Sequence, residues 1–180
     1  MEEKIKHEIK NLSANIPKDL FLNLIRELYF QTSWELIKNL IENENLDPEI
    51  LFKQQLEISK KTGIQGANAL KPFKFSGKPL EQVVKKFIFA AFNMGVKTEF
   101  KFLNDDECEI VFKRNCGHGV KIKQYNLPFI CNKWCEVHFN AEINELNPDY
   151  EIKFVEGMPQ NKSYCKFLIS KKDSKKSSNK

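Results

Sequence analysis

The hydrophobic periodicity of this chain changes at Gly95, and this change limits the folds that it can adopt. Before Gly95, apolar residues such as Ile5 and Ile9 recur every three or four positions, which is typical of amphipathic helices. After Gly95, residues 97–103 and 107–114 alternate apolar and polar side chains, which predicts two strands of a hairpin. The sequence therefore predicts a helical first half and a sheet-forming second half.

Local signals place further helices in the first half. Asp47 can cap a helix that begins at Pro48, and we expect this helix to end near Lys61, before a glycine-containing segment. Another helix is expected to begin near Pro79 and to stop at Gly95.

The second half contains one helix between two strand pairs. Residues 131–146 lie between two proline-containing segments and are predicted to be helical. Residues 150–157 and 163–170 alternate like the first pair and predict a second hairpin. The expected fold class is α+β, with an N-terminal helical layer packed against an antiparallel sheet of about four strands in β-β-α-β-β order.

We expect a single domain over residues 1–170. Within it, residues 1–74 form the helical part and residues 78–170 form the mixed part. Residues 171–180 hold five lysines and one aspartate, and we expect a disordered basic tail. The tail supplies +4 of the net charge of +5, so the rest of the chain is nearly neutral and nucleic acid is not expected as a partner.

The location of the protein follows from segments that the sequence lacks. No stretch reaches the ~18 consecutive apolar residues that a membrane span needs. The first ten residues, MEEKIKHEIK, have no apolar core of the kind that a secretory signal requires. We therefore expect a cytoplasmic protein without a membrane partner. The apolar faces of residues 1–46 are candidates for a homodimer contact.

The cysteines cluster in the second half. The chain has an odd number of cysteines, five, and four of them follow residue 115 beside two of the three histidines. Without an export signal, this count indicates free thiols rather than a disulfide framework. On the predicted helix, Cys131, Cys135, His138 and Glu142 fall at i, i+4, i+7 and i+11, which places them in one stripe.

Three interpretations of this cluster remain open. The first is a metal site, since zinc and iron favour thiolate and imidazole ligands. The paired CxxC motifs of structural zinc modules are absent from the sequence. The candidate metal ligands are Cys116, Cys131, Cys135 and His138, with His118 and Cys165 as further donors.

The second interpretation is thiol or acid–base chemistry on a small molecule. Cys131 lies near a helix start, where the helix dipole lowers a thiol pKa, and His138 or Glu142 can carry a proton. The third is ordinary packing, because free cysteine behaves as a small hydrophobic residue. Cys108 and Cys165 lie inside predicted strands and fit this third interpretation best.

Residues 116–169 carry a family resemblance. A cysteine after a strand, the segment LPFICNKWCEVHFNAEINELNPDYEIKF and the strand YCKFLI resemble the L-2-amino-thiazoline-4-carboxylic acid hydrolase-like family. The order of elements is also similar to the 4-vinyl reductase domain. The first resemblance implies hydrolysis of a cyclic amidine-like C–N bond, which opens a thiazoline to an N-carbamoyl cysteine. The matching positions are Cys116, Cys131, Cys135 and Cys165, with Glu136 beside the second helix cysteine.

These observations define two functional hypotheses. The first is a small-molecule hydrolase with Cys131, Cys135, His138 and Glu142 in catalysis. The second is a non-catalytic domain, resembling 4-vinyl reductase-like domains, that binds a small ligand or a metal as a sensor or assembly module. The expected substrate-binding residues are Cys116, His118, Trp134, Glu136 and Cys165.

Overall fold

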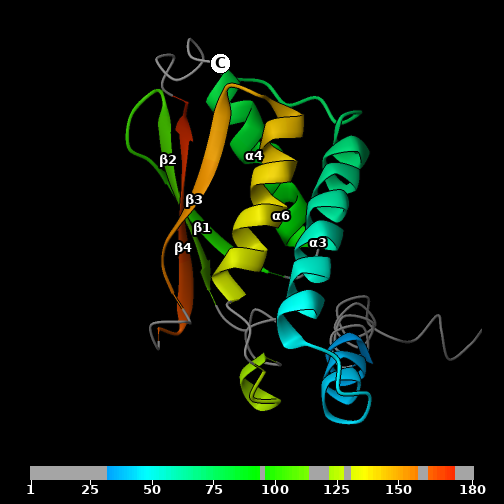
Figure 1. Cartoon of the computed structure of the whole chain (residues 1–180). Helices are drawn as coiled ribbons and strands as arrows, with labels where there is room; N and C mark the ends of the chain where they lie inside the picture. Colours follow the sequence, from blue (N-terminus) through cyan, green and yellow to red (C-terminus); the bar gives the residue numbers. More distant parts are fainter. Residues whose placement is uncertain (1–31, 94–95, 114–121, 128–130, 158–161, 173–180) are drawn as a thin grey trace, which may run out of the picture.

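The computed structural model describes residues 32–93, 96–113, 122–127, 131–157 and 162–172. Its elements follow the predicted order of helices and then β-β-α-β-β, which confirms the α+β fold class (Figure 1). The elements are α3 (Pro48–Leu70), α4 (Pro79–Asn93), β1 (Lys97–Phe102), β2 (Glu107–Lys113), α6 (Cys131–Leu146), β3 (Tyr150–Glu156) and β4 (Tyr164–Lys171).

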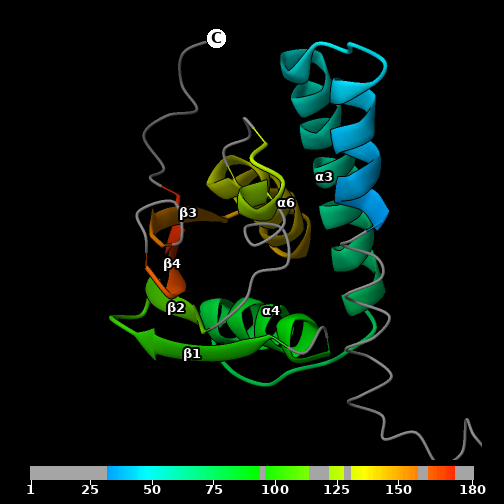
Figure 2. The same cartoon turned by 90° about the horizontal axis from the view of Figure 1, so that it is seen from below.

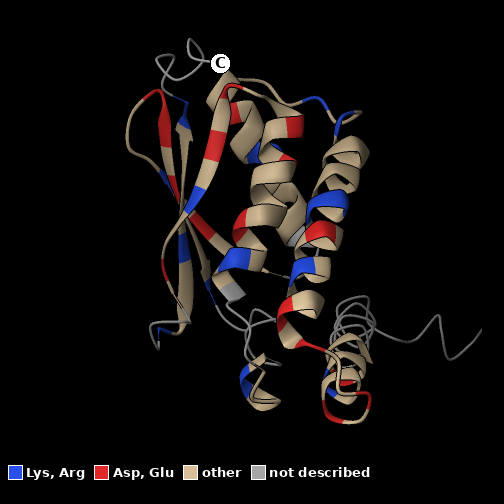
Figure 3. Cartoon of the chain, in the orientation of Figure 1, with Lys and Arg blue, Asp and Glu red and all other residues tan. Residues whose placement is uncertain are grey.

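The four described strands form one antiparallel sheet in the order β1-β2-β4-β3. Helix α6 connects the two hairpins and lies on one face of the sheet together with α4 (Figures 1 and 2). Helix α3 packs on the far side of α6, so α6 lies between the sheet and α3 (Figure 2). Charged residues of both signs are spread over the strands and helices, without separation into a basic and an acidic face in this view (Figure 3).

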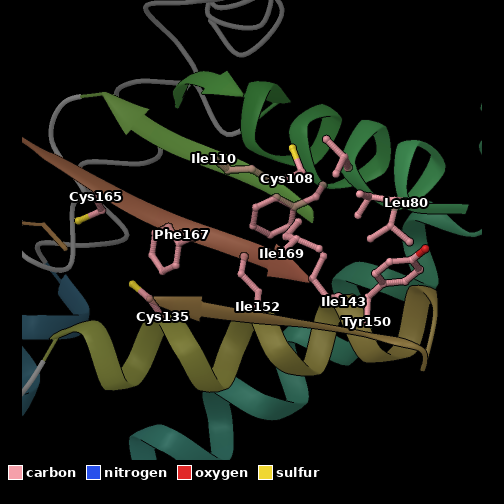
Figure 4. Packing of buried hydrophobic residues seen from close by; sticks show 13 residues of the cluster. Leu80, Cys108, Ile110, Cys135, Ile143, Tyr150, Ile152, Cys165, Phe167 and Ile169 are labelled. Carbon is pink, nitrogen blue, oxygen red and sulfur yellow. The ribbon is translucent and has the colours of Figure 1, made fainter. Parts of the chain in front are cut away.

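The main core lies between the sheet and the helices that cover it. Strand β4 alternates buried and more exposed residues, as the period-two pattern predicted. Phe167, Ile152 and Leu80 are among the side chains that fill this space (Figure 4). The buried members are Leu80, Val83, Val84, Phe87, Cys108, Ile110, Cys135, Ile143, Tyr150, Ile152, Cys165, Phe167 and Ile169.

A second, smaller cluster joins the helical residues 32–42 to the start of α3. Trp34 and Ile37 are buried together with Ile122. The partly buried side chains around them are Ile41, Leu51, Phe52, Tyr125 and Leu127.

Helix α3 is longer than the sequence signals predicted. Asp47 caps it as expected, and its Oδ1 accepts a hydrogen bond from Glu49 N at 2.8 Å. The predicted end near Lys61 was wrong, because the helix continues through both glycines to Leu70. Each glycine costs about 1 kcal/mol relative to alanine inside a helix. The contact of α3 with α6 offsets this cost, and the buried residues of α3 are Ser59, Gly63, Ala67 and Leu70.

Several predictions concern residues outside the described ranges. The predicted helices of residues 1–31, which carry most of the proposed dimer face, lie outside them, as do residues 173–180 of the predicted tail. In the part of the chain that the structure describes, no helix combines the length and apolar character that crossing a bilayer requires.

Candidate functional site

Helix α6 presents its side chains to three different neighbours. Cys135 and Ile143 are buried in the main core (Figure 4). His138 turns toward α3, where its ring reaches the backbone of Ser59. Asn140 turns toward the edge strand β3. Side chains of α6 therefore contact the main core, helix α3 and strand β3.

The His138 ring is held in place by hydrogen bonding to α3. Its Nδ1 lies 3.1 Å from the carbonyl oxygen of Ser59 and 3.2 Å from Oγ1 of Thr62. A carbonyl oxygen only accepts, so Nδ1 carries the proton and Nε2 is left as an acceptor. Burial lowers the pKa of His138, and the Ser59 carbonyl opposes this in part. The ring is therefore neutral at pH 7, with Nε2 available.

Glu142 is a buried carboxyl group one turn further along α6. Its residue is 3% exposed, and burial raises its pKa to about 8. At pH 7 the group is therefore mostly protonated, and it can donate one hydrogen bond. Its Oε1 has no hydrogen-bond partner among the described residues.

The two groups lie close together without bonding directly. Nε2 of His138 and Oε2 of Glu142 are 3.9 Å apart, which is longer than a hydrogen bond. A polar contact at this separation can be bridged by a third group that reaches both atoms. We call His138 and Glu142 the polar pair.

Aromatic rings surround the polar pair. The His138 ring stacks on Trp134, with centroids 5.1 Å apart and an interplanar angle of 9°. Phe139 meets the His138 ring edge-on at 5.5 Å. Phe139 also packs against Phe87 at 5.0 Å and Phe167 at 5.2 Å, which connects the polar pair to the main core. The setting is apolar and aromatic, with few polar atoms.

Small residues allow α3 to approach α6 closely beside the polar pair. A Cβ atom on Gly63 would overlap the carbonyl oxygen of His138 and would lie 3.2 Å from Cβ of Ala141. The hydroxyl group of Ser59 donates to the carbonyl oxygen of Trp134 at 3.0 Å. Glycine at position 63 is therefore required by the close contact of the two helices.

The cysteines that the structure describes are packed in the core. Cys108, Cys135 and Cys165 are buried cysteines, and burial raises the pKa of Cys108 to about 11. A Cβ on Gly157 would lie 2.8 Å from Sγ of Cys165, so backbone covers this thiol. Cys108 and Cys165 pack in the main core, as their positions inside predicted strands indicated, and the predicted substrate-binding role of Cys165 stays a prediction.

The predicted site residues are only partly assembled. His138 and Glu142 meet as the predicted stripe requires, whereas Cys135 is buried in the main core and Cys165 is covered by the backbone at Gly157. Trp134 stacks on His138, and its predicted role in substrate binding stays a prediction. Cys116, His118 and the side chain of Cys131 lie outside the described residues, so their predicted roles stay predictions.

The predicted metal site also stays a prediction. Across the described ranges, no group of three His, Cys, Asp or Glu side chains is placed to hold a metal ion. Cys135 and His138 are the described members of the predicted ligand set, and they contact different elements. The remaining members, Cys116 and Cys131, have no described side chain.

Some of the residues around the polar pair were not found from the sequence. Ser59, Thr62 and Gly63 come from α3, more than seventy positions before His138. The spacing of Ser59, Gly63 and Ala67 at i, i+4 and i+8 is a signal for a close helix contact. This signal indicates that α3 has a small-residue face, but not which helix lies against it.

Glu136 and Asn140 have structural partners on strand β3. Asn140 donates from Nδ2 to the carbonyl oxygen of Ile152 at 2.7 Å and accepts from its N–H group at 2.9 Å. Oε1 of Glu136 accepts a hydrogen bond from Phe154 N at 3.1 Å. Both side chains thus bind the backbone of an edge strand, which accounts for their position on α6 without a ligand.

Comparisons with known proteins identify the fold. The sequence matches no family model and no curated protein. Among solved structures, the phenol-responsive sensory domain of the transcription activator PoxR with phenol has a TM-score of 0.60 at 10% identity, over 79% of this chain and 74% of that one. Trafficking protein particle complex subunit 3 from Naegleria fowleri, covalently bound to palmitic acid, has a TM-score of 0.58 at 16% identity, over 84% of this chain and 97% of that one. At these identities, the likeness shows a shared fold.

Proposed function

We propose that this chain is a small-ligand-binding domain in which Glu142 supplies the polar contact to an otherwise apolar ligand. The observation that carries the proposal is the buried Oε1 of Glu142, which has no hydrogen-bond partner among the described residues. Buried polar atoms in folded proteins are nearly always paired, so an unpaired one calls for a ligand or an ordered water.

The polar pair defines the chemistry that the ligand must offer. Protonated Glu142 donates one hydrogen bond, while Nε2 of His138 accepts one, and 3.9 Å separates Nε2 from Oε2 of Glu142. A hydroxyl group can accept from Glu142 and donate to His138 at the same time. The rings of Trp134 and Phe139 favour an apolar or aromatic body next to that hydroxyl group.

The solved structures with this fold support such a ligand. One of them is described with phenol and the other with palmitic acid. Both molecules combine an apolar body with a single polar end. The sensor or assembly hypothesis from the sequence therefore has more support than the hydrolase hypothesis.

Calorimetric titration with phenol and with benzene tests the proposal. Both have the same ring, and only phenol has a hydroxyl group for the polar pair. We expect the wild-type chain to bind phenol more tightly than benzene. Glu142→Leu should weaken phenol binding by about tenfold, because it removes a hydrogen bond worth roughly 1–2 kcal/mol, and should leave benzene binding unchanged.

The matched control is Glu145→Leu, which removes a carboxylate from the next turn of α6. Glu145 forms an exposed ion pair with Lys71 and does not belong to the polar pair. This variant should bind phenol like the wild type. Equal phenol affinity in wild type and Glu142→Leu would remove Glu142 from the proposal.

A hydrolase is the second candidate, and the polar pair is the observation that favours it. A neutral imidazole beside a carboxyl group with a pKa of about 8 can move a proton near neutral pH. Cys131 or Cys135 would be the nucleophile, although Cys135 is buried. Incubation with 2-amino-thiazoline-4-carboxylate and detection of N-carbamoyl cysteine tests this candidate. Binding without product favours the ligand-binding domain, and full turnover by both Cys131→Ser and Cys135→Ser excludes the thiol mechanism.

A further inference from the structure

The two edges of the sheet differ in how their backbone groups are satisfied. Strand β3 forms one edge, and Asn140 and Glu136 of α6 bind the backbone of Ile152 and Phe154 there. A register shift between Phe154 and Glu156 further interrupts this edge. Side chains and an irregular register are both known means of closing a sheet edge to further pairing.

Strand β1 forms the other edge, and the described residues leave it open. Leu103 N donates to the carbonyl oxygen of Glu107 on β2. Because backbone groups alternate in direction along an antiparallel strand, those of Thr98, Phe100 and Phe102 point away from β2. No described residue hydrogen-bonds to these outward backbone groups. Strand β1 therefore offers donors and acceptors to another strand.

Exposed aromatic side chains accompany the open edge. Phe100 and Phe102 are 52% and 38% exposed, although they share the sheet face that carries the core residue Ile110. Beside them lies an apolar groove of about 330 Å³ between β1, α4 and the segment before α4. Its lining residues are Phe75, Lys85, Ile88, Phe89 and Phe100. Contiguous exposed apolar surface of this kind is typical of a binding face.

The direction of the backbone groups restricts how two copies of β1 can pair. Residues with outward backbone groups must lie opposite one another in an antiparallel ladder. Two registers meet this requirement and also pair most residues of β1 with the second copy. In one of them Glu99 faces its own copy and Lys97 faces Lys101, so every charged residue faces a like charge.

The other register is complementary in charge. It places Phe100 opposite its own copy on a two-fold axis and Thr98 opposite Phe102. Glu99 then faces Lys101 of the second copy, and the symmetry generates this pair twice. Opposite charges and aromatic pairs across strands both stabilise a sheet. We propose that two copies of this chain dimerise through antiparallel pairing of their β1 strands, centred on Phe100, to form one continuous sheet.

The partner is a second copy because the strand is complementary to itself. A two-fold contact of this kind uses the same patch on both subunits, so complementarity must exist within one sequence. The alternating charges of Lys97, Glu99 and Lys101 give this self-complementarity only in the register centred on Phe100, where Glu99 faces Lys101. This inference concerns a surface separate from the polar pair and does not depend on the proposed ligand.

Sedimentation velocity of the full chain under reducing conditions, over a range of concentrations, tests the dimer. We expect a concentration-dependent dimer in the wild type. Lys101→Glu places glutamate opposite Glu99 twice, and Glu99→Lys places lysine opposite Lys101 twice. Each single variant should weaken the dimer by about tenfold or more, because two favourable pairs become unfavourable.

The double variant Glu99→Lys with Lys101→Glu separates the dimer contact from contacts within one chain. Within the chain, Glu99 pairs with Lys113, and Lys101 lies opposite Glu109, so both replacements stay unfavourable there. Only the contact between copies becomes complementary again. The double variant should therefore dimerise more strongly than either single variant. The matched control is Lys153→Glu on the β3 edge, which should leave the dimer unchanged.

Hydrogen exchange supplies a second readout. The amides of Thr98, Phe100 and Phe102 should become protected as the concentration rises, while neighbouring amides that already bond to β2 should not change. A monomer at all concentrations overturns the proposal. A dimer that resists both single variants overturns it as well and favours the contact through residues 1–46. The proposal is also overturned if the double variant dimerises no more strongly than the single variants.

Discussion

At the scale of single residues, the carboxyl group of Glu142 links the stability of the fold to pH. Burial raises its pKa to about 8, above its value in the unfolded chain. The folded state therefore binds an extra proton between the two pKa values, and this contribution to stability is lost as the pH rises through about 8. His138 acts in the opposite sense, because burial lowers its pKa: its contribution is present above the unfolded pKa and is lost as the pH falls through the lower pKa of the folded state.

The variant Glu142→Gln isolates the carboxyl group. Glutamine cannot ionise, so the variant does not lose stability in this way. The unfolding free energy of the variant minus that of the wild type should increase by roughly 1 kcal/mol for each pH unit from about pH 5 to pH 8. Urea unfolding at several pH values measures this difference. A constant difference between the two proteins would contradict the raised pKa.

Burial also determines how the described thiols react. Cys108, Cys135 and Cys165 are buried, and a thiol must be accessible and ionised to react. We expect all three to resist alkylation by iodoacetamide in the native protein at pH 8 and to react after unfolding. Mass spectrometry of the alkylated peptides gives the result for each position. Rapid native labelling of Cys135 would support the thiol mechanism over packing.

At the scale of elements, the contact between α3 and α6 positions His138. A Cβ on Gly63 would overlap the carbonyl oxygen of His138, which is backbone and cannot move independently of its helix. Gly63→Ala should therefore lower the unfolding free energy by about 1–3 kcal/mol and should weaken ligand binding at the polar pair. Chemical denaturation and calorimetry measure the two effects.

Helix α3 provides a matched control three residues further along. A Cβ on Gly66 meets no atom within 4 Å. Gly66→Ala should therefore stabilise the helix by about 0.5–1 kcal/mol, since alanine has the higher helix propensity. The same substitution is thus expected to have opposite signs at the two positions. Equal effects would show that the helices are not in close contact.

The closure of the β3 edge by α6 is a second feature at this scale. Asn140→Ala leaves the N–H and carbonyl groups of Ile152 without their partner, which should cost about 1–3 kcal/mol of unfolding free energy. Asn144→Ala is the control, because the side chain of Asn144 is exposed and accepts a hydrogen bond from the exposed Lys172. Thermal or urea unfolding of both variants measures the difference. Equal destabilisation would contradict a specific role of Asn140.

At the scale of the whole molecule, a ligand bound at the polar pair should stabilise the entire domain. A ligand that binds only the folded state adds about 2.7 kcal/mol at a concentration of one hundred times its Kd. Phenol should therefore raise the Tm in proportion to the logarithm of its concentration. Glu142→Leu should make the Tm depend less on phenol concentration. A wild-type Tm that does not change with phenol concentration would argue against phenol-like ligands.

The sequence was informative about elements whose signals are local. The bounds of α6 at Cys131 and Leu146 and the bounds of the strands to within about two residues agree with the predictions, because alternation and prolines act over a few positions. The end of α3 was wrong for the converse reason. Gly63 has a low helix propensity, and the sequence does not show the contact with α6 through which the helix continues to Leu70.

The candidate site divides in the same way. Helical spacing alone placed His138 and Glu142 on one side of α6, and the structure brings them to 3.9 Å. Their ionisation depends on burial by elements distant in the sequence, and the partners of His138, Ser59 and Thr62, come from α3. The sequence by itself therefore determined the order of elements and the spacing of groups along each one. Tertiary structure decided which groups are buried, neutral and without a partner, because desolvation depends on packing between elements.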